Sequence, residues 1–414
     1  MTWKRAFLGL IALVVLAAAG GVAAWYWNEE QTKDIRGSST LEFDTTEATT
    51  TRAVEQIETE PWPLYGLTPQ RTRNAVEFHH RPPFRTRWSF EAGGLVEFPP
   101  VIAYGRLYFA NISGQMRALD AKTGRVVWRQ SLGYKTAASP AVGDGVVYMP
   151  LMSKKGAEPG PNTGAVVALD AETGEEIWRF ETGAVESSPL LLDGVLYFGT
   201  FDHKLYALNA KSKKVLWSFS TGDAVKGGPA YWNGSIFTGS YDGKVYALDA
   251  RTGKQRWSSS SRGGILGGGN FYATPAVAYG RVFVGNTDGR MYAYGAGTGH
   301  LLWAKKTGGY VYSSAAIADR TVYVGSYDKH LYALDAATGD VKWSFDANGE
   351  VSGAPTVMDG LVYFSTFARR TYALDAQSGK SVWEFPGGRY TPIVADSQRT
   401  YLVGQSKLRA LVDE

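Results

Sequence analysis

The chain has 414 residues, of which 43 are Lys or Arg and 39 are Asp or Glu, so its formal net charge is only +4. This charge gives no support to a nucleic-acid partner, which calls for a strongly basic surface. The chain contains no cysteine, which excludes disulfides, thiolate metal sites, a cysteine nucleophile and a lipidated N-terminal cysteine. Its 49 Gly, 24 Tyr and 13 Trp are typical of an all-β protein with many tight turns.

The first predicted element is a transmembrane helix at residues 6–27. Lys4 and Arg5 precede an uncharged, mostly apolar stretch that ends in the aromatic residues 25–27, and about 20 apolar residues suffice to span a bilayer. The basic flank predicts a cytoplasmic tip at residues 1–5, so we expect a single-pass protein of the cell membrane with the rest of the chain outside the cytoplasm. The alternative is a cleaved signal peptide, with Val22, Ala23 and Ala24 as the small-residue site.

Two non-repetitive segments come next. Residues 28–60 are acidic, rich in Thr and poor in aromatic residues, and this composition predicts a flexible stalk. Residues 61–86 form a lead-in segment. A basic stretch starts within it and runs to residue 87. We interpret that stretch as a solvated lead-in, with contact to lipid headgroups or acidic partners as the alternative. The basic residues are Arg71, Arg73, Arg81, Arg85 and Arg87.

From residue 87 onward the chain repeats itself with a period near 40 residues. Eight tryptophans mark the period, and seven of them follow a phrase of the form YALDAATGDVKW (332–343). A period of this length with several short strands in each unit indicates the blades of a β-propeller. The eight tryptophans are Trp88, Trp128, Trp178, Trp217, Trp257, Trp303, Trp343 and Trp383.

The two ends of the repeat region complement each other. The last unit supplies three strands and lacks the one that carries the tryptophan, whereas the first strand, 87–90, has no phrase before it. We therefore predict an eight-bladed propeller over residues 87–414, closed by strand 87–90 against the C-terminal strands. Two longer intervals, 152–164 and 258–270, are expected to be loop insertions.

The phrase at 332–343 closely resembles the tryptophan-docking repeat of pyrroloquinoline quinone (PQQ) propellers, and seven copies cover residues 117–383. The resemblance implies that the repeat tryptophans pack between neighbouring blades. The copy at 207–217 departs from the pattern, with Asn209, Ser212 and Lys213 in place of Asp, Thr and Gly. The family includes PQQ-dependent dehydrogenases, the sensor halves of some kinases, and BamB-type scaffolds that carry no cofactor.

Catalytic and metal-binding motifs are not found. The five histidines show no metal-ligand spacing, and no nucleophile elbow is present. The repeated Asp residues occupy one turn position in successive units, so we interpret them as structural; they are Asp120, Asp170, Asp249, Asp335 and Asp375. We therefore expect no metal and no cofactor, with PQQ and calcium as the alternative, and the sequence leans against an enzyme.

One set of residues is predicted to line the mouth of the central channel. Each stands three residues before the start of an inner strand in its unit: Glu97, Ala137, Glu186, Lys226, Tyr272, Tyr312, Ser352 and Arg389. We expect ion pairs between Glu186 and Lys226 and between Arg389 and Glu97, which belong to neighbouring blades. The ring is either a set of exposed ion pairs that keeps the mouth soluble or a recognition site for a peptide or small ligand.

The sequence thus favours a membrane-anchored extracytoplasmic scaffold, BamB-like and non-enzymatic, that presents its loops and channel mouth to protein partners. The propeller is expected to be monomeric and to bind no nucleic acid. Two alternatives stay open: a PQQ-dependent dehydrogenase, and a receptor for a small molecule or a glycan.

Overall fold

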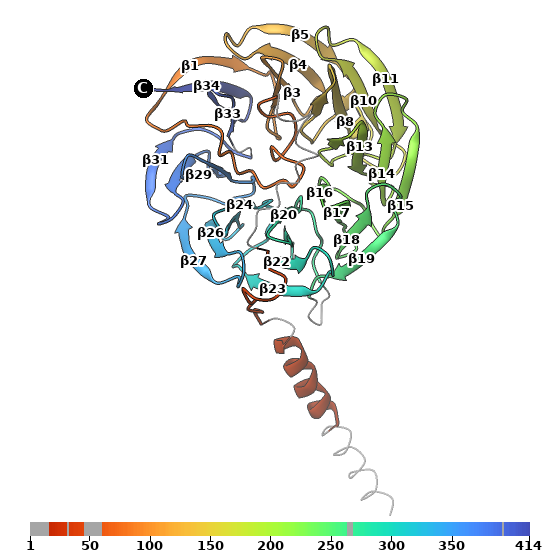
Figure 1. The fold of residues 1–414 in the computed structure, drawn as a ribbon, viewed down its shortest axis with the longest axis vertical. Helices are drawn as coiled ribbons and strands as arrows, with labels where there is room; N and C mark the ends of the chain where they lie inside the picture. The colour runs from red at the N-terminus through yellow and green to blue at the C-terminus, as the bar shows by residue number, and fades with distance from the viewer. Residues whose placement is uncertain (1–15, 31–32, 45–59, 263–267, 391–392) are drawn as a thin grey trace, which may run out of the picture.

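The chain forms a ring of eight four-stranded antiparallel sheets in the computed structural model (Figure 1). The structure describes residues 16–30, 33–44, 60–262, 268–390 and 393–414. Each sheet is a blade whose first strand lies near the centre of the ring and whose fourth strand lies at the rim (Figure 1). The prediction of an all-β, eight-bladed propeller is confirmed.

Blades 1 to 4 are listed here from the inner to the outer strand. Blade 1 contains β2 (Val101–Ala103), β3 (Arg106–Ala110), β4 (Gln115–Asp120) and β5 (Val126–Ser131). Blade 2 contains β7 (Ala141–Gly143), β8 (Val146–Leu151), β10 (Gly164–Asp170) and β11 (Glu176–Thr182). Blade 3 contains β12 (Leu190–Leu192), β13 (Val195–Gly199), β14 (Lys204–Asn209) and β15 (Val215–Ser220). Blade 4 contains β16 (Ala230–Trp232), β17 (Ser235–Gly239), β18 (Lys244–Asp249) and β19 (Gln255–Ser260).

Blades 5 to 8 follow the same order. Blade 5 contains β20 (Ala276–Ala278), β21 (Arg281–Gly285), β22 (Arg290–Gly295) and β23 (Leu301–Lys306). Blade 6 contains β24 (Ala316–Ala318), β25 (Thr321–Gly325), β26 (His330–Asp335) and β27 (Val341–Asp346). Blade 7 contains β28 (Thr356–Met358), β29 (Leu361–Ser365), β30 (Thr371–Asp375) and β31 (Ser381–Phe385). Blade 8 contains β32 (Val394–Ala395), β33 (Thr400–Gly404), β34 (Lys407–Asp413) and β1 (Phe84–Glu91).

Blade 8 closes the ring. Its outer strand β1 pairs antiparallel with β34, with Trp88 opposite Ala410. The predicted closure is confirmed, and the strand is longer than the predicted 87–90. Within the first insertion, β9 (Ser153–Lys154) pairs with β6 (Tyr134–Lys135), which adds a small second sheet beside blade 2.

The repeat tryptophans join each blade to the next. Among the residues that the structure describes, seven of the eight repeat tryptophans donate their indole N–H to an alanine carbonyl of the following blade, as Trp303 does to Ala336 at 3.1 Å. The glycine of the turn phrase lies against the ring of the preceding tryptophan. At Gly339, where φ is +76°, an added Cβ would come within 2.8 Å of the Trp303 ring. This close approach, together with the left-handed backbone, explains why the phrase contains Gly after its Thr.

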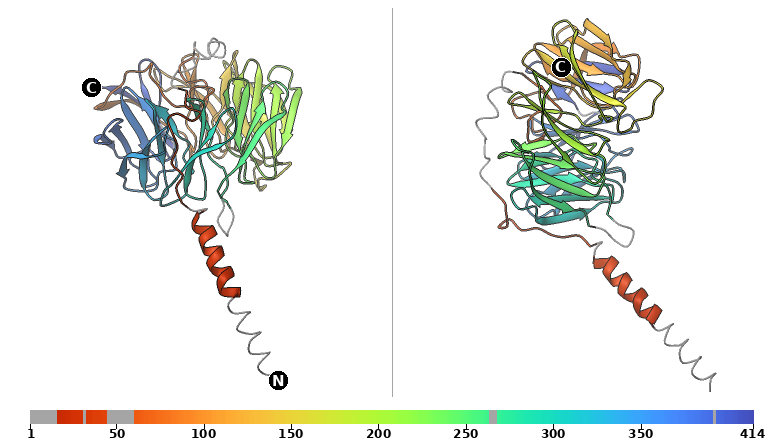
Figure 2. Two further views of the ribbon diagram at one scale, coloured as in Figure 1. Left: turned by 60° about the horizontal axis from the view of Figure 1, so that its bottom comes forward. Right: turned by 90° about the vertical axis from the view of Figure 1, so that its right-hand side faces the viewer.

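The N-terminal helix covers residues 16–30 in the part of the chain that the structure describes, and it projects from the rim of the ring (Figure 2). No helix in the described residues is long and apolar enough to cross a bilayer. Residues 6–15 of the predicted span lie outside the described residues.

Residues 33–44 differ from the free stalk that composition suggested. We call them the strap, because they lie along blades 5 and 6. Ile35 pairs with Ala304 of β23 through two backbone hydrogen bonds of 2.9 and 3.0 Å. Arg281, whose side chain is fully buried, donates to the carbonyls of Ser38 and Leu41 at 2.7 and 2.6 Å. These hydrogen bonds satisfy backbone groups of the strap and the buried guanidinium of Arg281 in blade 5. Composition alone does not reveal that the strap docks on the blades.

The strap ends in an aromatic contact. Phe43 stacks on Tyr279 with their ring centroids 5.2 Å apart. The guanidinium groups of Arg281 and Arg320 lie 4.9 and 5.0 Å from the Phe43 ring, one in each of two adjacent blades. Phe43 therefore fastens the strap at the seam between blades 5 and 6.

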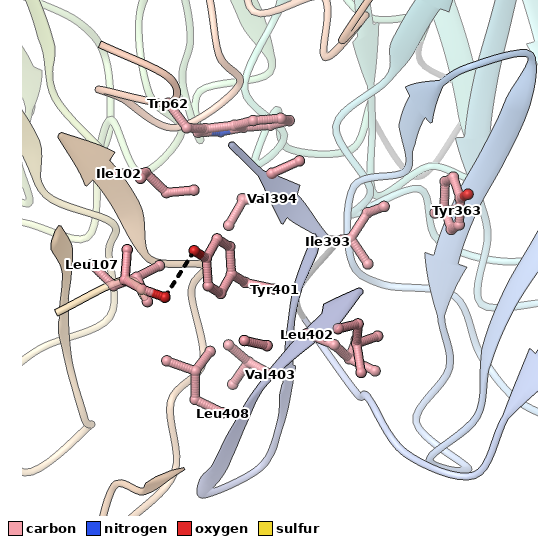
Figure 3. Packing of buried hydrophobic residues seen from close by; sticks show 14 of the residues in the cluster. Trp62, Ile102, Leu107, Tyr363, Ile393, Val394, Tyr401, Leu402, Val403 and Leu408 are labelled. Carbon is pink, nitrogen blue, oxygen red and sulfur yellow. Dashed lines mark hydrogen bonds between the residues drawn. The ribbon is translucent and has the colours of Figure 1, made fainter. Parts of the chain in front are cut away.

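The lead-in segment enters the centre of the ring (Figure 1). We call residues 62–75 the central plug. Its backbone carbonyls accept hydrogen bonds of 2.7–3.0 Å from the middle residue of the inner strand in six blades: Ile102, Val142, Tyr231, Val277, Ile317 and Val357. These inner strands have no further neighbour in their own sheets, so the plug satisfies amides that would otherwise face the channel unpaired. Trp62 of the plug lies over Ile102 and Val394, in a cluster of buried residues from blades 7, 8 and 1 (Figure 3).

The basic residues of the lead-in therefore include two that are not solvated. Arg71 and Arg73 are 0% and 1% exposed, which corrects the interpretation of the stretch as solvated. Arg71 donates to the carbonyls of Pro229 at 2.9 Å and Pro189 at 3.0 Å, and so connects blades 4 and 3. Burial lowers the pKa of Arg71 to about 9, which still leaves it charged at neutral pH.

Candidate functional site

A cavity of about 70 Å³ opens at one end of the central channel, above the plug. Its walls are the loops that precede the inner strands, and we call this side of the ring the mouth face. The opposite face carries the turns between the first and second strands of each blade. The lining comprises Tyr65, Glu97, Phe98, Pro99, Glu186, Ser188, Lys226, Gly227, Gly228, Tyr272, Ala273, Thr274, Tyr312, Ser314, Ser352, Gly353, Ala354 and Tyr390.

The structure brings together most of the ring residues that the repeat register indicated. Glu97, Glu186, Lys226, Tyr272, Tyr312 and Ser352 all line the cavity. Arg389 lies beside it, and its guanidinium sits 4.7 Å from the ring of Tyr390 and 5.7 Å from that of Phe367. Ala137 of blade 2 is buried and does not line the cavity.

Glu186 is the centre of the polar network. Its carboxylate lies 3.6 Å from the Lys226 ammonium, as expected from their neighbouring blades, and accepts a hydrogen bond from the Tyr272 hydroxyl at 2.8 Å. The Lys226 ammonium is also 4.4 Å from the Phe201 ring and 4.5 Å from the Tyr241 ring. Its charge is therefore shared between one carboxylate and two aromatic faces.

Glu97 is less well satisfied. It is half-buried, and within the described residues it forms no hydrogen bond or ion pair. The expected ion pair with Arg389 is not formed, because the guanidinium stacks on aromatic rings instead. Burial, with the nearby Glu186 carboxylate, raises the pKa of Glu97, while Arg389 acts in the opposite direction from a distance.

An aromatic arc surrounds the cavity from blade 4 to blade 8. Successive rings lie 5.0–6.4 Å apart in edge-on or tilted arrangements, from Tyr241 through Tyr272, Tyr312, Tyr327 and Phe367 to Tyr390. Tyr310, on the outer side of the arc, is 54% exposed. The arc combines large apolar rings with hydroxyl groups at a solvent boundary, a composition enriched at binding surfaces.

The sequence reasoning missed part of this arc. Phe201, Tyr241, Tyr327 and Phe367 all occupy one register position, at the start of the turn between the second and third strands. The repeat alignment could have revealed them, because the same position is aromatic in four units. Tyr65 was beyond the reach of any repeat pattern, because it belongs to the plug and forms the floor of the cavity.

The site residues do not fit a calcium–quinone centre. Ca²⁺ takes six to eight oxygen ligands, several of them carboxylates. Glu186 is engaged by an ammonium and a hydroxyl donor, which occupy the positions that a cation would need. Within the described ranges, no group of three His, Asp or Glu side chains is placed to hold a metal ion. We therefore assign no redox step to the cavity.

The repeated Asp residues occupy the turns of the opposite face. Asp120 accepts from the backbone N–H of Thr123 at 2.7 Å and from its hydroxyl at 2.6 Å, and Asn209 makes the equivalent contacts with Ser212. These hydrogen bonds lower the pKa of Asp120. Their geometry fits the interpretation of these residues as turn-forming.

Comparison with known proteins agrees with the fold. A family model described as outer membrane protein assembly factor BamB matches residues 82–158, 159–226, 204–314 and 304–411. BamB of Nitrosomonas eutropha is 28% identical over 124 residues, which is 30% of this chain and 28% of that protein. The match thus covers less than a third of this relative's own length.

Solved structures with the same fold include a BamB protein and alcohol dehydrogenases. BamB from Moraxella catarrhalis superposes with a TM-score of 0.66 at 17% identity, over 80% of this chain and 99% of that one. The quinohemoprotein alcohol dehydrogenase ADHIIG from Pseudomonas putida HK5 gives 0.72 at 15% identity, over 88% and 82%. At such identities the likeness establishes the propeller and not the activity. Because the family model matches nearly the whole ring, the chain belongs to the PQQ-like propeller family described as outer membrane protein assembly factor BamB.

Proposed function

We propose that the protein is a non-enzymatic binding scaffold that presents the mouth face of its propeller to protein partners. The observation that carries this proposal is the aromatic arc. It lines a solvent-accessible cavity at one end of the channel, while the central plug fills the interior behind it. Tyr and Arg are the residues that most often dominate binding energy at protein interfaces, and the arc offers both at its rim.

Two further features support the scaffold. Family membership joins the chain to proteins that are described as assembly factors. The Glu186 carboxylate at the mouth is already engaged by Lys226 and Tyr272, which disfavours a resident metal or quinone there. In this proposal the scaffold works without PQQ, as a monomer, and residues 6–27 hold it at the membrane.

Site-specific photo-crosslinking in native membranes tests the proposal. We expect p-benzoylphenylalanine at position 310 to give discrete adducts with a partner protein. The same residue at position 104 is the matched control, because Tyr104 is also exposed, at 42%, but lies in the β2–β3 turn of the opposite face. Tyr312→Ala in the same chain should abolish the adducts from position 310. Equal adducts from both positions, or none from position 310, would overturn the proposal.

The dehydrogenase alternative has its own assay. The full chain with PQQ and Ca²⁺ should reduce no dye in the presence of alcohols or sugars. Dye reduction that disappears in Glu186→Gln would show that the mouth is a quinone site and the protein an enzyme.

The membrane anchor is tested separately by alkaline extraction. The full chain should stay with the membrane pellet at high pH, and at a size that includes residues 1–27. Release into the supernatant would refute the anchor and would have no bearing on the proposal for the mouth face.

A further inference from the structure

The cavity at the mouth carries an excess of negative charge. Its ionisable lining consists of two carboxylates, Glu97 and Glu186, against one ammonium, Lys226, apart from the tyrosines. Lys226 is paired with Glu186 and held between two rings, so it does not neutralise Glu97. One carboxylate therefore faces the cavity without a cation.

The surrounding charges do not remove this excess. Arg389 is the one cation that lowers the pKa of Glu97, and its effect does not outweigh burial and the Glu186 charge. The buried Arg71 and Arg73 lie below the floor of the cavity, and they are not among the charges that shift the pKa of Glu97. The Arg71 donors are occupied by backbone carbonyls of the channel wall.

The rest of the lining is aromatic. Five rings belong to it: Tyr65, Phe98, Tyr272, Tyr312 and Tyr390. The negative face of an aromatic ring attracts a cation, and the attraction grows when the cation is desolvated. Rings that surround a free carboxylate form a site for an organic ammonium group, which has both a charge and an apolar stem.

The size of the cavity limits the ligand. A volume of about 70 Å³ holds on the order of five water-sized groups. The tip of a lysine side chain, with its ammonium and a few methylenes, matches this space.

The geometry points to recognition of an alkylammonium group at the mouth, with Glu97 as its counter-ion and Tyr272, Tyr312 and Tyr390 as the surrounding rings. This inference rests on the proposed function, because it names the chemistry of what the mouth face binds. The same group occurs on a lysine side chain of a partner protein and on a free diamine, and both would make the same contacts.

Ligand-observed NMR on the full chain in detergent micelles tests the inference. The probes are N-α-acetyl-lysine amide, its neutral N-ε-acetylated form, and cadaverine. We expect saturable binding of the first, at least about ten-fold weaker binding of the neutral form, and a similar loss in Glu97→Gln, because a hydrogen bond to a charged group is lost. Glu384→Gln is the matched control. Glu384 lies on the outer strand β31, pairs with Arg370 and does not line the cavity.

The three probes distinguish the two sources of the ammonium group. Tighter binding of the capped lysine than of cadaverine supports a partner's lysine, and the reverse supports a free diamine. Equal binding of the charged and neutral forms, preferential binding of PQQ, or no binding by a folded protein overturns the inference. If Glu97→Gln fails to fold, Tyr312→Leu, which removes a ring and no charge, should reduce binding by a similar factor.

The crosslinking experiment keeps the two proposals apart. Adducts from position 310 with no amine binding would support the scaffold proposal and refute the ammonium site. Amine binding without adducts would keep the site and remove the protein scaffold.

Discussion

The hydroxyl of Tyr272 donates a hydrogen bond of 2.8 Å to the carboxylate of Glu186, although the two residues belong to blades 5 and 3. Tyr272 therefore reaches across blade 4, whose Lys226 contacts the same carboxylate at 3.6 Å. Three blades are thus joined at the mouth by one partly buried network. Burial and the Glu186 charge raise the pKa of Tyr272 well above its usual value, so it stays a donor at physiological pH.

The network predicts the effect of removing one hydroxyl. Tyr272→Phe should lower the free energy of unfolding by about 1.5–3 kcal/mol, because a hydrogen bond to a charged group is lost while the Glu186 carboxylate stays partly buried. Urea denaturation measures the change. Tyr310→Phe is the control, since no hydrogen bond of its hydroxyl is recorded within the described residues and its ring is 54% exposed. Equal stability of both variants would show that the network contributes nothing.

The contact between Gly339 and Trp303 predicts the cost of a single methyl group. Gly339→Ala should destabilise the protein by about 1–3 kcal/mol more than Gly360→Ala, through overpacking against the indole. Gly360 has nearly the same backbone, with φ of +73° against +76°, but nothing lies within 4 Å of an added Cβ. Both variants carry the backbone cost of about 1–2 kcal/mol. Thermal unfolding of the pair therefore isolates the tryptophan contact, and identical melting temperatures would contradict it.

The strap predicts a local change without a global one. Phe43→Ala removes the stacking on Tyr279 and the contact with two guanidinium groups, together worth about 1–2 kcal/mol. Hydrogen exchange of the Ile35 amide, which bonds to Ala304, should become roughly ten-fold faster while the propeller melts at the same temperature. Leu41→Ala is the control, because Leu41 is 55% exposed. Unchanged exchange in Phe43→Ala would mean that Phe43 does not hold the strap.

Glu97 predicts a dependence of stability on pH. Its folded pKa is raised by burial and by Glu186, so the native state binds more protons than the unfolded state in the window above the unfolded pKa, near 4.3. The stability contributed by this group is fully present below that value and is lost as pH rises through the folded pKa. The groups that face Glu97 in this window are Glu186 and Arg389.

Urea midpoints between pH 4 and 8 test this sign. The stability of the wild type relative to Glu97→Gln should fall as pH rises, whereas the difference relative to Glu384→Gln should show no such fall. Ammonium binding should strengthen over the same window, since it requires the ionised carboxylate. A difference that rises with pH would refute the environment assigned to Glu97.

Much of the architecture follows from the repeat alone. The spacing of the tryptophans and the complementary ends predicted eight blades and the closure of β1 on β34. The same register placed Glu97, Glu186 and Lys226 at the channel mouth, because a fixed period puts equivalent residues at equivalent heights in the ring. The same reasoning could have predicted the aromatic residues at a second repeat position, such as Phe201, at the start of the turn between the second and third strands.

The non-repetitive segments could not be placed from the sequence. Arg71 and Arg73 belong to a basic stretch, and their burial follows from carbonyl groups that converge only once the blades surround the channel. The strap belongs to the segment 28–60, which is acidic and poor in aromatic residues, yet the Arg281 side chain donates hydrogen bonds to its backbone, which composition does not show.

What the sequence determined by itself is the blade, its number and the closure of the ring. The blades depend on local periodicity and on the pairing of strands that are near in sequence, and the closure follows from the complementary incomplete units at the two ends of the repeat region. What only the tertiary structure decided is how the plug, the strap and the network of Glu186, Lys226 and Tyr272 fit together. Their partners are tens to hundreds of residues apart in the chain, and the surfaces that bind them do not exist until the ring has formed.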